Sequence, residues 1–167
     1  MKIAGFYDES ISNGLGWRAV LFVSGCPHHC EGCHNKEAQD FSYGEPFDKE
    51  ALLERIEKNT ILKGITISGG EPLCRQNEQE VLEFIKEVKK TRPNFNVWCY
   101  TGYTLEELNA RNDGITKKIL QEIDVLVDGR YVETQKDATL KFRGSANQRI
   151  LDMNACMAQQ KAISFHV

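Results

Sequence analysis

Three closely spaced cysteines, Cys26, Cys30 and Cys33, are the residues of this chain best suited to chemistry. Thiolates are soft ligands for iron-sulfur clusters and for zinc, and the gaps between these three are three residues and then two. A cluster of four irons held by only three thiolates keeps one iron without a protein ligand, so a small molecule can bind there. The spacing therefore predicts a reactive metal centre with these three cysteines as its protein ligands.

Zinc is the alternative that these residues leave open, because an imidazole from His28, His29 or His34 could complete a tetrahedral site. Structural zinc sites usually pair Cys-x2-4-Cys with a second ligand couple, and bacterial ferredoxins place a fourth cysteine nearby, so neither pattern fits well. Three inert, buried thiols fit still less, since proline, glycine and polar residues in the same stretch are typical of an exposed loop.

A pair of glycines marks a second candidate site, formed by Ser68, Gly69, Gly70 and Glu71. Glycine has no Cβ atom, so the backbone at this pair can approach a ligand that a larger residue would hold away. On its own the sequence is more typical of a tight turn between a strand and a helix. In a chain that also carries the cysteine motif, it favours a ligand site.

The Cys-x3-Cys-x2-Cys motif and the downstream Gly-Gly-Glu-Pro at residues 69–72 resemble the two motifs of the radical S-adenosylmethionine (SAM) enzymes. The resemblance implies one 4Fe-4S cluster per chain with three cysteine ligands, and SAM bound through its methionine end to the fourth iron. It also implies that Ser68 to Glu71 receive the amino group of SAM. The residues expected to contact the adenosine are Gly32, Cys33 and His34. In such a site the cluster and SAM carry the chemistry, so no side chain is given a catalytic role.

Asn13 to Arg18 resembles a stretch of the enzymes that activate glycyl-radical proteins, with Leu15 where proline is common. Later stretches narrow the resemblance to the activating component of the anaerobic, class III ribonucleotide reductase. They are Trp98 to Tyr103, Val127 to Tyr131 and Arg143 to Arg149, and the resemblance covers nearly all of Met1 to Asp152. It implies an enzyme that cleaves SAM reductively, with an electron from a low-potential donor, and leaves a glycyl radical on the large catalytic subunit of the reductase. The last stretch is expected to meet this partner or the carboxylate of SAM.

Three other functions remain as alternatives to this interpretation. One is an activase of another glycyl-radical enzyme, such as pyruvate formate-lyase. The second is a radical SAM enzyme that acts on a small molecule. The third is a non-enzymatic iron-sulfur or zinc binding module.

Apolar, strand-like stretches alternate with helical patterns along the chain and position these motifs. Strands are expected at residues 19–23, 64–68, 96–100 and 125–128. Helices are expected at residues 48–58, 78–90 and 115–123, with one more after Tyr103, where Thr104 and Glu107 have the form of a capping box. The candidate motifs all follow the carboxyl ends of predicted strands, where parallel sheets bind their ligands.

The alternation predicts an α/β fold, namely a truncated, partly open (β/α) barrel of five to six parallel strands. A complete eight-stranded barrel takes about 250 residues, and this chain has 167. We expect residues 1–153 to form the radical SAM domain and residues 154–167 to form a C-terminal tail of open role.

Composition and charge argue against several other classes of protein. The chain is 41% hydrophobic, and its net charge is −3 with basic residues scattered among acids, so we expect one domain that binds no nucleic acid. No apolar run has the length of a membrane span or secretory signal, which favours a cytoplasmic protein without membrane association. Cys74, Cys99 and Cys156 are expected to be small buried hydrophobic residues.

Overall fold

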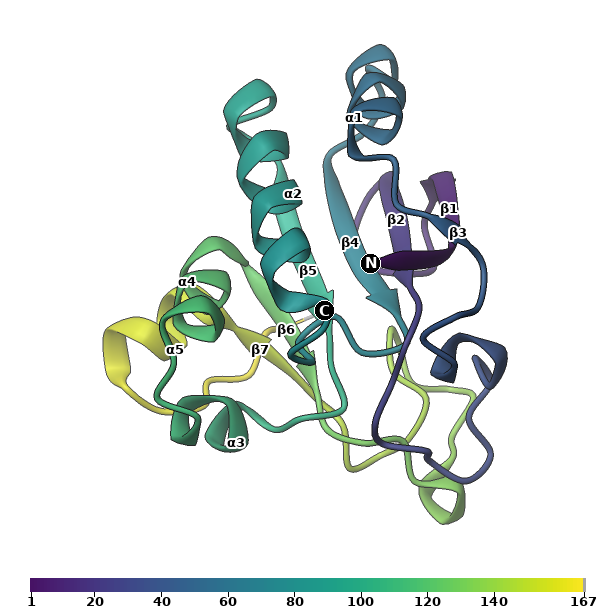
Figure 1. The fold of residues 1–167 in the computed structure, drawn as a ribbon. Helices are drawn as coiled ribbons and strands as arrows, with labels where there is room; N and C mark the ends of the chain where they lie inside the picture. The colour runs from purple at the N-terminus through teal and green to yellow at the C-terminus, as the bar shows by residue number, and fades with distance from the viewer. Residues whose placement is uncertain (167) are drawn as a thin grey trace.

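Within residues 1–166, which the computed structural model describes, the chain folds around one mixed sheet of seven strands (Figure 1). In chain order the strands are β1 (Lys2–Ser10), β2 (Arg18–Val23), β3 (Glu45–Pro46), β4 (Gly64–Gly69), β5 (Asn96–Tyr100), β6 (Val125–Asp128) and β7 (Arg149–Asp152). Their order across the sheet is β3-β1-β2-β4-β5-β6-β7.

Helices connect most of the strands. They are α1 (Lys49–Lys58), α2 (Glu78–Thr91), α3 (Leu105–Ala110), α4 (Gly114–Glu122) and α5 (Met153–Gln159), with short 3-10 helices at Glu37–Gln39 and Glu133–Gln135. None of the helices in the described part of the chain is both long and apolar enough to cross a membrane.

The four central strands are parallel, since β2 pairs with β4, β4 with β5, and β5 with β6. They match the four strands predicted from the sequence to within one residue. The prediction of five to six parallel strands is wrong, because β1 and β7 run antiparallel to β2 and β6. A parallel crossover needs a dozen or more residues, usually with a helix. Only residues 11–17 join β1 to β2, and no α-helix lies in residues 129–148 between β6 and β7.

The predicted helices are confirmed, and capping side chains explain where α1 and α3 begin. The Asp48 carboxylate accepts the Ala51 N–H at the start of α1. At α3, Thr104 and Glu107 form the predicted capping box, in which each side chain accepts the other's backbone N–H. Each contact satisfies an N–H group that has no partner within the helix.

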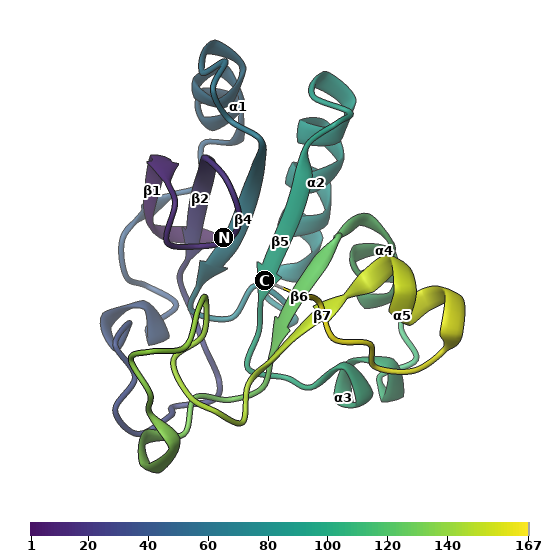
Figure 2. The same cartoon turned by 180° about the vertical axis from the view of Figure 1, so that it is seen from behind.

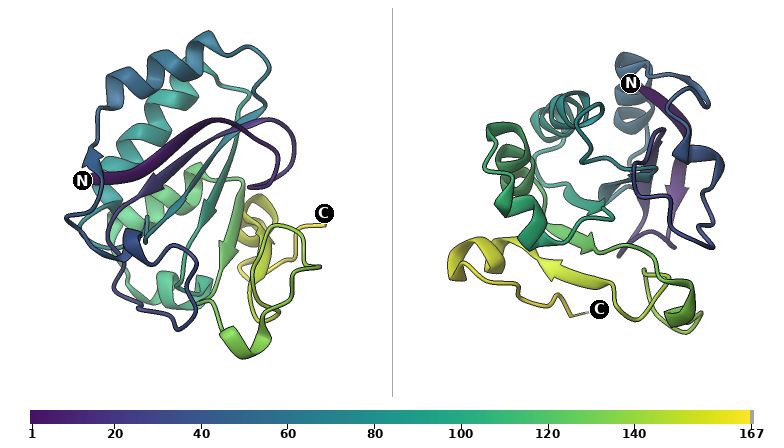
Figure 3. Two further views of the ribbon diagram at one scale, coloured as in Figure 1. Left: turned by 90° about the vertical axis from the view of Figure 1, so that its right-hand side faces the viewer. Right: turned by 60° about the horizontal axis from the view of Figure 1, so that its bottom comes forward.

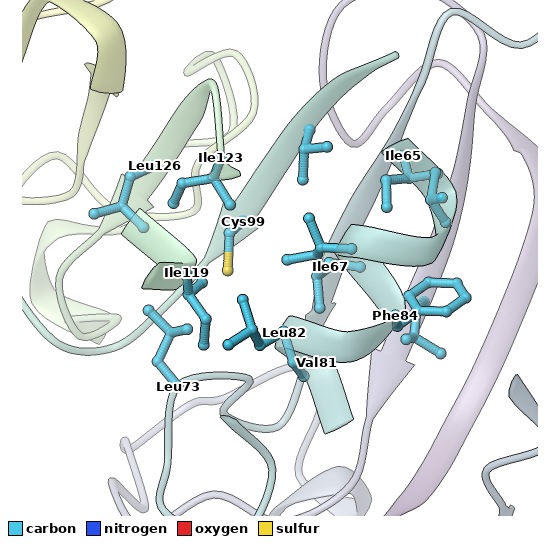
Figure 4. Close-up of a cluster of buried hydrophobic side chains, with 14 of the residues drawn as sticks. Ile65, Ile67, Leu73, Val81, Leu82, Phe84, Cys99, Ile119, Ile123 and Leu126 are labelled. Carbon is cyan, nitrogen blue, oxygen red and sulfur yellow. The ribbon is translucent and has the colours of Figure 1, made fainter. Parts of the chain in front are cut away.

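The main hydrophobic core lies between the sheet and helices α1, α2 and α4. Figure 4 shows side chains of the sheet and of α2 and α4 meeting there, among them Ile67, Val81 and Ile119. Cys74, Cys99 and Cys156 are all buried, with exposed fractions of 2%, 0% and 4%, so their prediction as small hydrophobic residues is confirmed.

The other face of the sheet is partly covered by C-terminal segments, which Figure 2 shows passing across β6 and β7. Trp98 on β5 packs edge-to-face against Phe142 and Phe165, with ring centroids 5.4 and 5.6 Å apart. The Phe165 N–H donates to the Ile150 carbonyl of β7 at 2.8 Å. Residues 162–165 therefore cover an edge and a face of the sheet.

Arg18 is buried at the opposite end of the strands from the cysteine motif. Its guanidinium donates to Thr66 Oγ1 and to the carbonyl oxygens of Leu15, Ile65 and Asn96, over distances of 2.5 to 3.0 Å. Burial lowers the pKa of Arg18 to about 10, so the group is still charged at neutral pH. The arginine thus joins the β1–β2 hairpin to two neighbouring strands.

Candidate functional site

Four loops that follow the parallel strands lie together at one end of the sheet (Figure 3). They are residues 24–36 after β2, 70–77 after β4, 101–104 after β5 and 129–148 after β6. Backbone hydrogen bonds join them in pairs. The Glu71 N–H donates to the Gly25 carbonyl at 2.7 Å, and the Gly129 N–H donates to the Tyr103 carbonyl at 3.0 Å. The prediction that the candidate motifs share one edge of the sheet is confirmed.

Residues 26–33, here called the cysteine loop, form a curled segment fixed by backbone contacts. The Cys26 N–H donates to the Gln39 carbonyl at 3.0 Å, which holds the start of the loop. The Cys33 N–H donates to the Cys30 carbonyl at 3.3 Å, which closes a turn at its end. The three cysteines therefore occupy a defined loop.

The three thiols of this loop are free and half-buried. Burial raises the pKa of Cys26 to about 11, although the backbone N–H of His28 donates to the sulfur and acts in the opposite direction. Burial also raises the pKa of Cys30, whose sulfur accepts the N–H of Tyr131. The neighbouring thiols, Cys33 among them, raise these values further. Metal ligation requires thiolates, so a bound cation must supply the stabilisation that the surroundings do not.

The donor set fits a cluster on three thiolates better than it fits a single metal ion. Among residues 1–166, no three His, Cys, Asp or Glu side chains converge closely enough to hold one ion. A four-iron cluster presents a different iron to each thiolate, so its ligands stand further apart than ligands of one zinc ion. Two candidate zinc ligands also have other partners: His28 Nε2 lies 2.8 Å from Glu71 Oε2, and His29 Nδ1 lies 3.3 Å from Gln39 Oε1.

The double glycine permits a close contact between two loops. A Cβ atom on Gly70 would lie 2.5 Å from the carbonyl oxygen of Gly25 and 2.6 Å from that of Ala38. The Gly70 N–H donates to the Val23 carbonyl at 2.7 Å. Gly69 has a φ of +105°, a conformation that glycine adopts readily. The sequence suggested that missing Cβ atoms leave room for a ligand, and part of that room is filled by backbone next to the cysteine loop.

The Glu71 carboxylate is fully buried and lies where three loops meet. Its Oε1 accepts the Leu73 N–H at 2.9 Å and the Thr101 hydroxyl at 2.8 Å. Its Oε2 accepts the Gly102 N–H at 2.7 Å and contacts His28 Nε2. Both oxygens therefore have protein partners, and the role expected for Glu71 toward SAM stays a prediction.

A pocket of about 290 Å³ lies beside the cysteine loop. Its apolar wall includes Tyr7 and Phe22, whose rings pack edge-to-face with centroids 4.9 Å apart. His34, Lys36 and Gly69 are among its polar and backbone lining. Two residues predicted to bind the cofactor, His34 and Gly69, are thus brought to one cavity.

The other predicted cofactor residues are not among those that line this pocket. Ser68 is half-buried and stands opposite Phe22 in the register of β4 and β2. Gly32 lies against Glu133, whose carboxylate occupies the place that a Cβ atom would take. Cys33 is half-buried at the end of the cysteine loop.

Residues 129–148 lie alongside the cysteine loop, as Figures 1 and 2 both show in green beside dark blue. The Tyr131 ring stands edge-to-face to His34, with centroids 6.4 Å apart. The Tyr131 hydroxyl donates to Glu133 at 2.5 Å. The segment thus contacts Gly32 of the cysteine loop through the Glu133 carboxylate, and His34 directly after the loop through Tyr131.

The two arginines at the ends of the Arg143 to Arg149 stretch have intramolecular partners. Arg149 donates to Asp128 and Glu106, and these hydrogen bonds raise the pKa of Arg149. Arg143 donates to the Gln148 carbonyl at 2.7 Å. In this structure both arginines hold the chain around β6 and β7.

Sequence reasoning did not identify the contacts of Glu71 with His28, Thr101 and Gly102. These partners lie 43, 30 and 31 residues away in the chain, and no local pattern connects them. The Thr-Gly pair directly after a predicted strand was the one available hint, because it falls at the same edge of the sheet as Glu71.

Comparison with known proteins gives a consistent result over most of the chain. Residues 12–151 match the family model described as a 4Fe-4S single cluster domain. The chain is 45% identical over 154 residues to the anaerobic ribonucleoside-triphosphate reductase-activating protein of Pasteurella multocida (strain Pm70), covering 90% of this chain and 96% of that protein. Proteins of the same name match at 40% identity over 152 residues in Escherichia coli (strain K12; 89% and 96% covered) and at 35% over 152 residues in Enterobacteria phage T4 (90% and 93% covered).

Proposed function

The chain belongs to the family of anaerobic ribonucleoside-triphosphate reductase-activating proteins, and we propose that it activates such a reductase by generating a glycyl radical on its large catalytic subunit. One observation carries the chemical part of this proposal. Three free cysteines lie in one loop, and that loop contacts Glu71 of the double-glycine segment beside the carboxyl ends of the parallel strands.

Cys26, Cys30 and Cys33 are proposed to hold one 4Fe-4S cluster. A cluster held there would provide one electron for the reductive cleavage of SAM to methionine and a 5′-deoxyadenosyl group, which would remove a hydrogen atom from the glycine. The backbone N–H groups of His28 and Tyr131 donate to two of the cysteine sulfurs, and hydrogen bonds of this kind tune cluster potentials. A sulfonium is hard to reduce, so a low-potential electron donor belongs to the scheme.

The adenosine of SAM is proposed to lie beside the cysteine loop, in contact with Gly32, Cys33 and His34. Support comes from the pocket, because His34 is one of its lining residues. The aromatic wall of Tyr7 and Phe22 offers a planar base an apolar surface for stacking.

The amino group of SAM is proposed to lie against Ser68, Gly69 and Gly70, which are half-buried and not fully covered by the protein. Backbone oxygens are suitable acceptors for an ammonium group. Glu71 completes this segment, and its negative charge favours a cation nearby even though its oxygens already have partners.

The four parallel strands are proposed to form the centre of a truncated, partly open barrel within residues 1–153, with residues 154–167 as a C-terminal tail. A barrel of so few strands leaves a wide lateral opening, which suits a polypeptide substrate better than a small metabolite. We place the protein in the cytoplasm, where thiols stay reduced.

Electron paramagnetic resonance (EPR) tests this function directly. Anaerobically reduced protein is mixed with SAM and the large reductase subunit, and the expected result is the doublet of a glycyl radical. Pyruvate formate-lyase in place of the reductase serves as the control for partner choice and is expected to give no doublet. Absence of a doublet with the reductase would reject the proposal, and a doublet with pyruvate formate-lyase alone would support the sister activase.

A further inference from the structure

His28 is the one histidine of the cysteine loop whose side chain points into the protein. Its side chain is 5% exposed, and it lies between two of the cysteines along the chain. Nε2 lies 2.8 Å from Glu71 Oε2, and the ring packs edge-to-face on Tyr103 with centroids 4.3 Å apart. The adjacent His29 is exposed.

Gly102 leaves the space that this imidazole occupies. A Cβ atom on Gly102 would lie 2.7 Å from His28 Nε2, closer than side chains approach one another. The Gly102 N–H also donates to Glu71, so a single residue both admits the imidazole and orients its partner. His28, Glu71 and Gly102 come from three separate loops, and the side chains of His28 and Glu71 are buried. Their contact is therefore specific to the folded chain.

Three protein groups donate hydrogen bonds to the Glu71 carboxylate in addition to its contact with His28. Leu73 and Thr101 donate to Oε1, and Gly102 donates to Oε2. The fourth contact, with His28 Nε2 at 2.8 Å, requires the hydrogen on Nε2 when the carboxylate is ionised, because an ionised carboxylate only accepts hydrogen bonds. The imidazole is therefore the side chain that connects a rigid carboxylate to the cysteine loop.

We propose that His28 and Glu71 form a positioning pair, which holds the cysteine loop in a fixed register with Gly69 and Gly70 so that SAM can bind both at once. The inference rests on the proposed function, because the pair can have this role only in a protein that binds SAM. It assigns Glu71 an additional role, as the anchor of the loop, and it gives His28 a role other than metal ligation. Neither residue is proposed to touch a reacting atom.

If the pair has this role, a change of His28 should weaken SAM binding without loss of the cluster. Three cysteines remain when His28 is changed, and the other donors to Glu71 remain as well, so folding and iron content are expected to persist. SAM, however, needs the loop and the glycines in register. A hydrogen bond to a charged partner is worth roughly a tenfold to hundredfold change in an equilibrium constant.

Matched substitutions at the two neighbouring histidines test the proposal. His28→Asn removes the reach to Glu71, because its amide ends one atom short of Nε2. His28→Gln keeps an N–H donor near the position of Nε2. His29→Asn is the control, since it makes the same change one residue away at an exposed side chain. Each protein is loaded anaerobically, and we measure iron and sulfide content, the SAM dissociation constant and the EPR spectrum of the reduced cluster with and without SAM.

The proposal expects His28→Asn to keep its iron and to bind SAM at least about tenfold more weakly, with a diminished SAM-dependent spectral change. His28→Gln and His29→Asn should stay within about threefold of the unmodified protein, less than the loss of one such bond. If His28→Asn fails to fold or load, Gly102→Ala is measured instead, because it displaces the imidazole while leaving both side chains intact.

Two results would overturn the proposal that His28 and Glu71 form a positioning pair. One is unchanged SAM binding in whichever of His28→Asn and Gly102→Ala loads its cluster. The other is an equal loss in His28→Gln and His28→Asn, which would mean that the ring itself matters and the hydrogen bond does not. Failure of the proposed function is a distinct outcome, because SAM would then leave the spectrum of the unmodified protein unchanged.

Discussion

The substitution Gly70→Ala tests whether the double glycine serves the contact between the two loops. Its Cβ atom would lie 2.5 and 2.6 Å from two backbone carbonyl oxygens, those of Gly25 and Ala38. A carbon and an oxygen in ordinary contact are about 3.3 Å apart or more, so the loops must separate by roughly 0.7–0.8 Å. Both oxygens belong to the backbone, and neither can rotate away as a side chain would.

The expected loss of stability for Gly70→Ala is about 2–3 kcal/mol, the upper part of the range for overpacked sites. For a chain of this length it corresponds to a fall in Tm of roughly 5–10 °C. Gly114→Ala is the control, because a Cβ atom there would meet nothing within 4 Å at the first residue of α4. Alanine is the better helix former, so this variant should be unchanged or more stable by less than about 1 kcal/mol.

Urea unfolding of the metal-free protein under reducing conditions, followed by circular dichroism, measures both variants on the same scale. Circular dichroism reports the helices and the sheet, so it does not depend on cluster loading. A stability of Gly70→Ala within about 0.5 kcal/mol of the Gly114→Ala protein, the usual range of harmless surface changes, would refute the claimed backbone contact.

Three further changes test other parts of the structure. Arg18→Met should lower the free energy of unfolding by about 3 kcal/mol in urea titrations, because buried carbonyl oxygens lose a charged donor, and an unchanged value would refute its joining role. Asp113→Ala should cost about 1 kcal/mol at pH 7 through loss of the α4 cap. Burial opposes ionisation of Asp113, but hydrogen bonds from Thr116 outweigh it and hold its pKa below the usual 3.8, so this difference should be complete above that pH and vanish as the pH falls below it. Alanine at each cysteine of the cysteine loop should abolish iron binding and SAM cleavage, and the control Cys99→Ala should keep its iron. SAM cleavage by any of the loop variants would contradict the ligand assignment.

The parallel centre of the fold was predictable because its strands and helices carry strong local patterns. The run at residues 19–23 is rich in residues with high strand propensity, and residues 78–90 repeat apolar side chains with helical spacing. The capping box at Thr104 and Glu107 fixed a helix start to the residue. In each case the chemistry that decides the structure lies within a few residues.

The antiparallel edges were not predictable in the same way. β1 mixes exposed and buried residues without regular alternation, and its pairing with β2 contains irregular register. β7 has only four residues, and its direction depends on how the long segment before it turns. Contacts between Phe165 and Trp98 likewise join residues far apart in the chain, so the packing of the C-terminal residues follows from tertiary structure alone.

The candidate site also has features that local sequence patterns predict and features that depend on tertiary structure. The cysteines and the glycine pair were singled out from the sequence, because metal ligation and close backbone approach require particular residue types, and their ligand roles stay predictions. The burial of Glu71 and its link to His28 were not found, since a carboxylate in a turn is ordinarily exposed. Only the folded chain shows that three loops share this one side chain.

Iron and sulfide analysis combined with EPR, on anaerobically prepared protein with and without SAM, shows whether the three cysteines hold a cluster that SAM can reach. We predict about four irons and four sulfides per chain, and a spectrum of the reduced cluster that changes when SAM is added. One zinc ion per chain, or a cluster whose spectrum is the same with and without SAM, would contradict it.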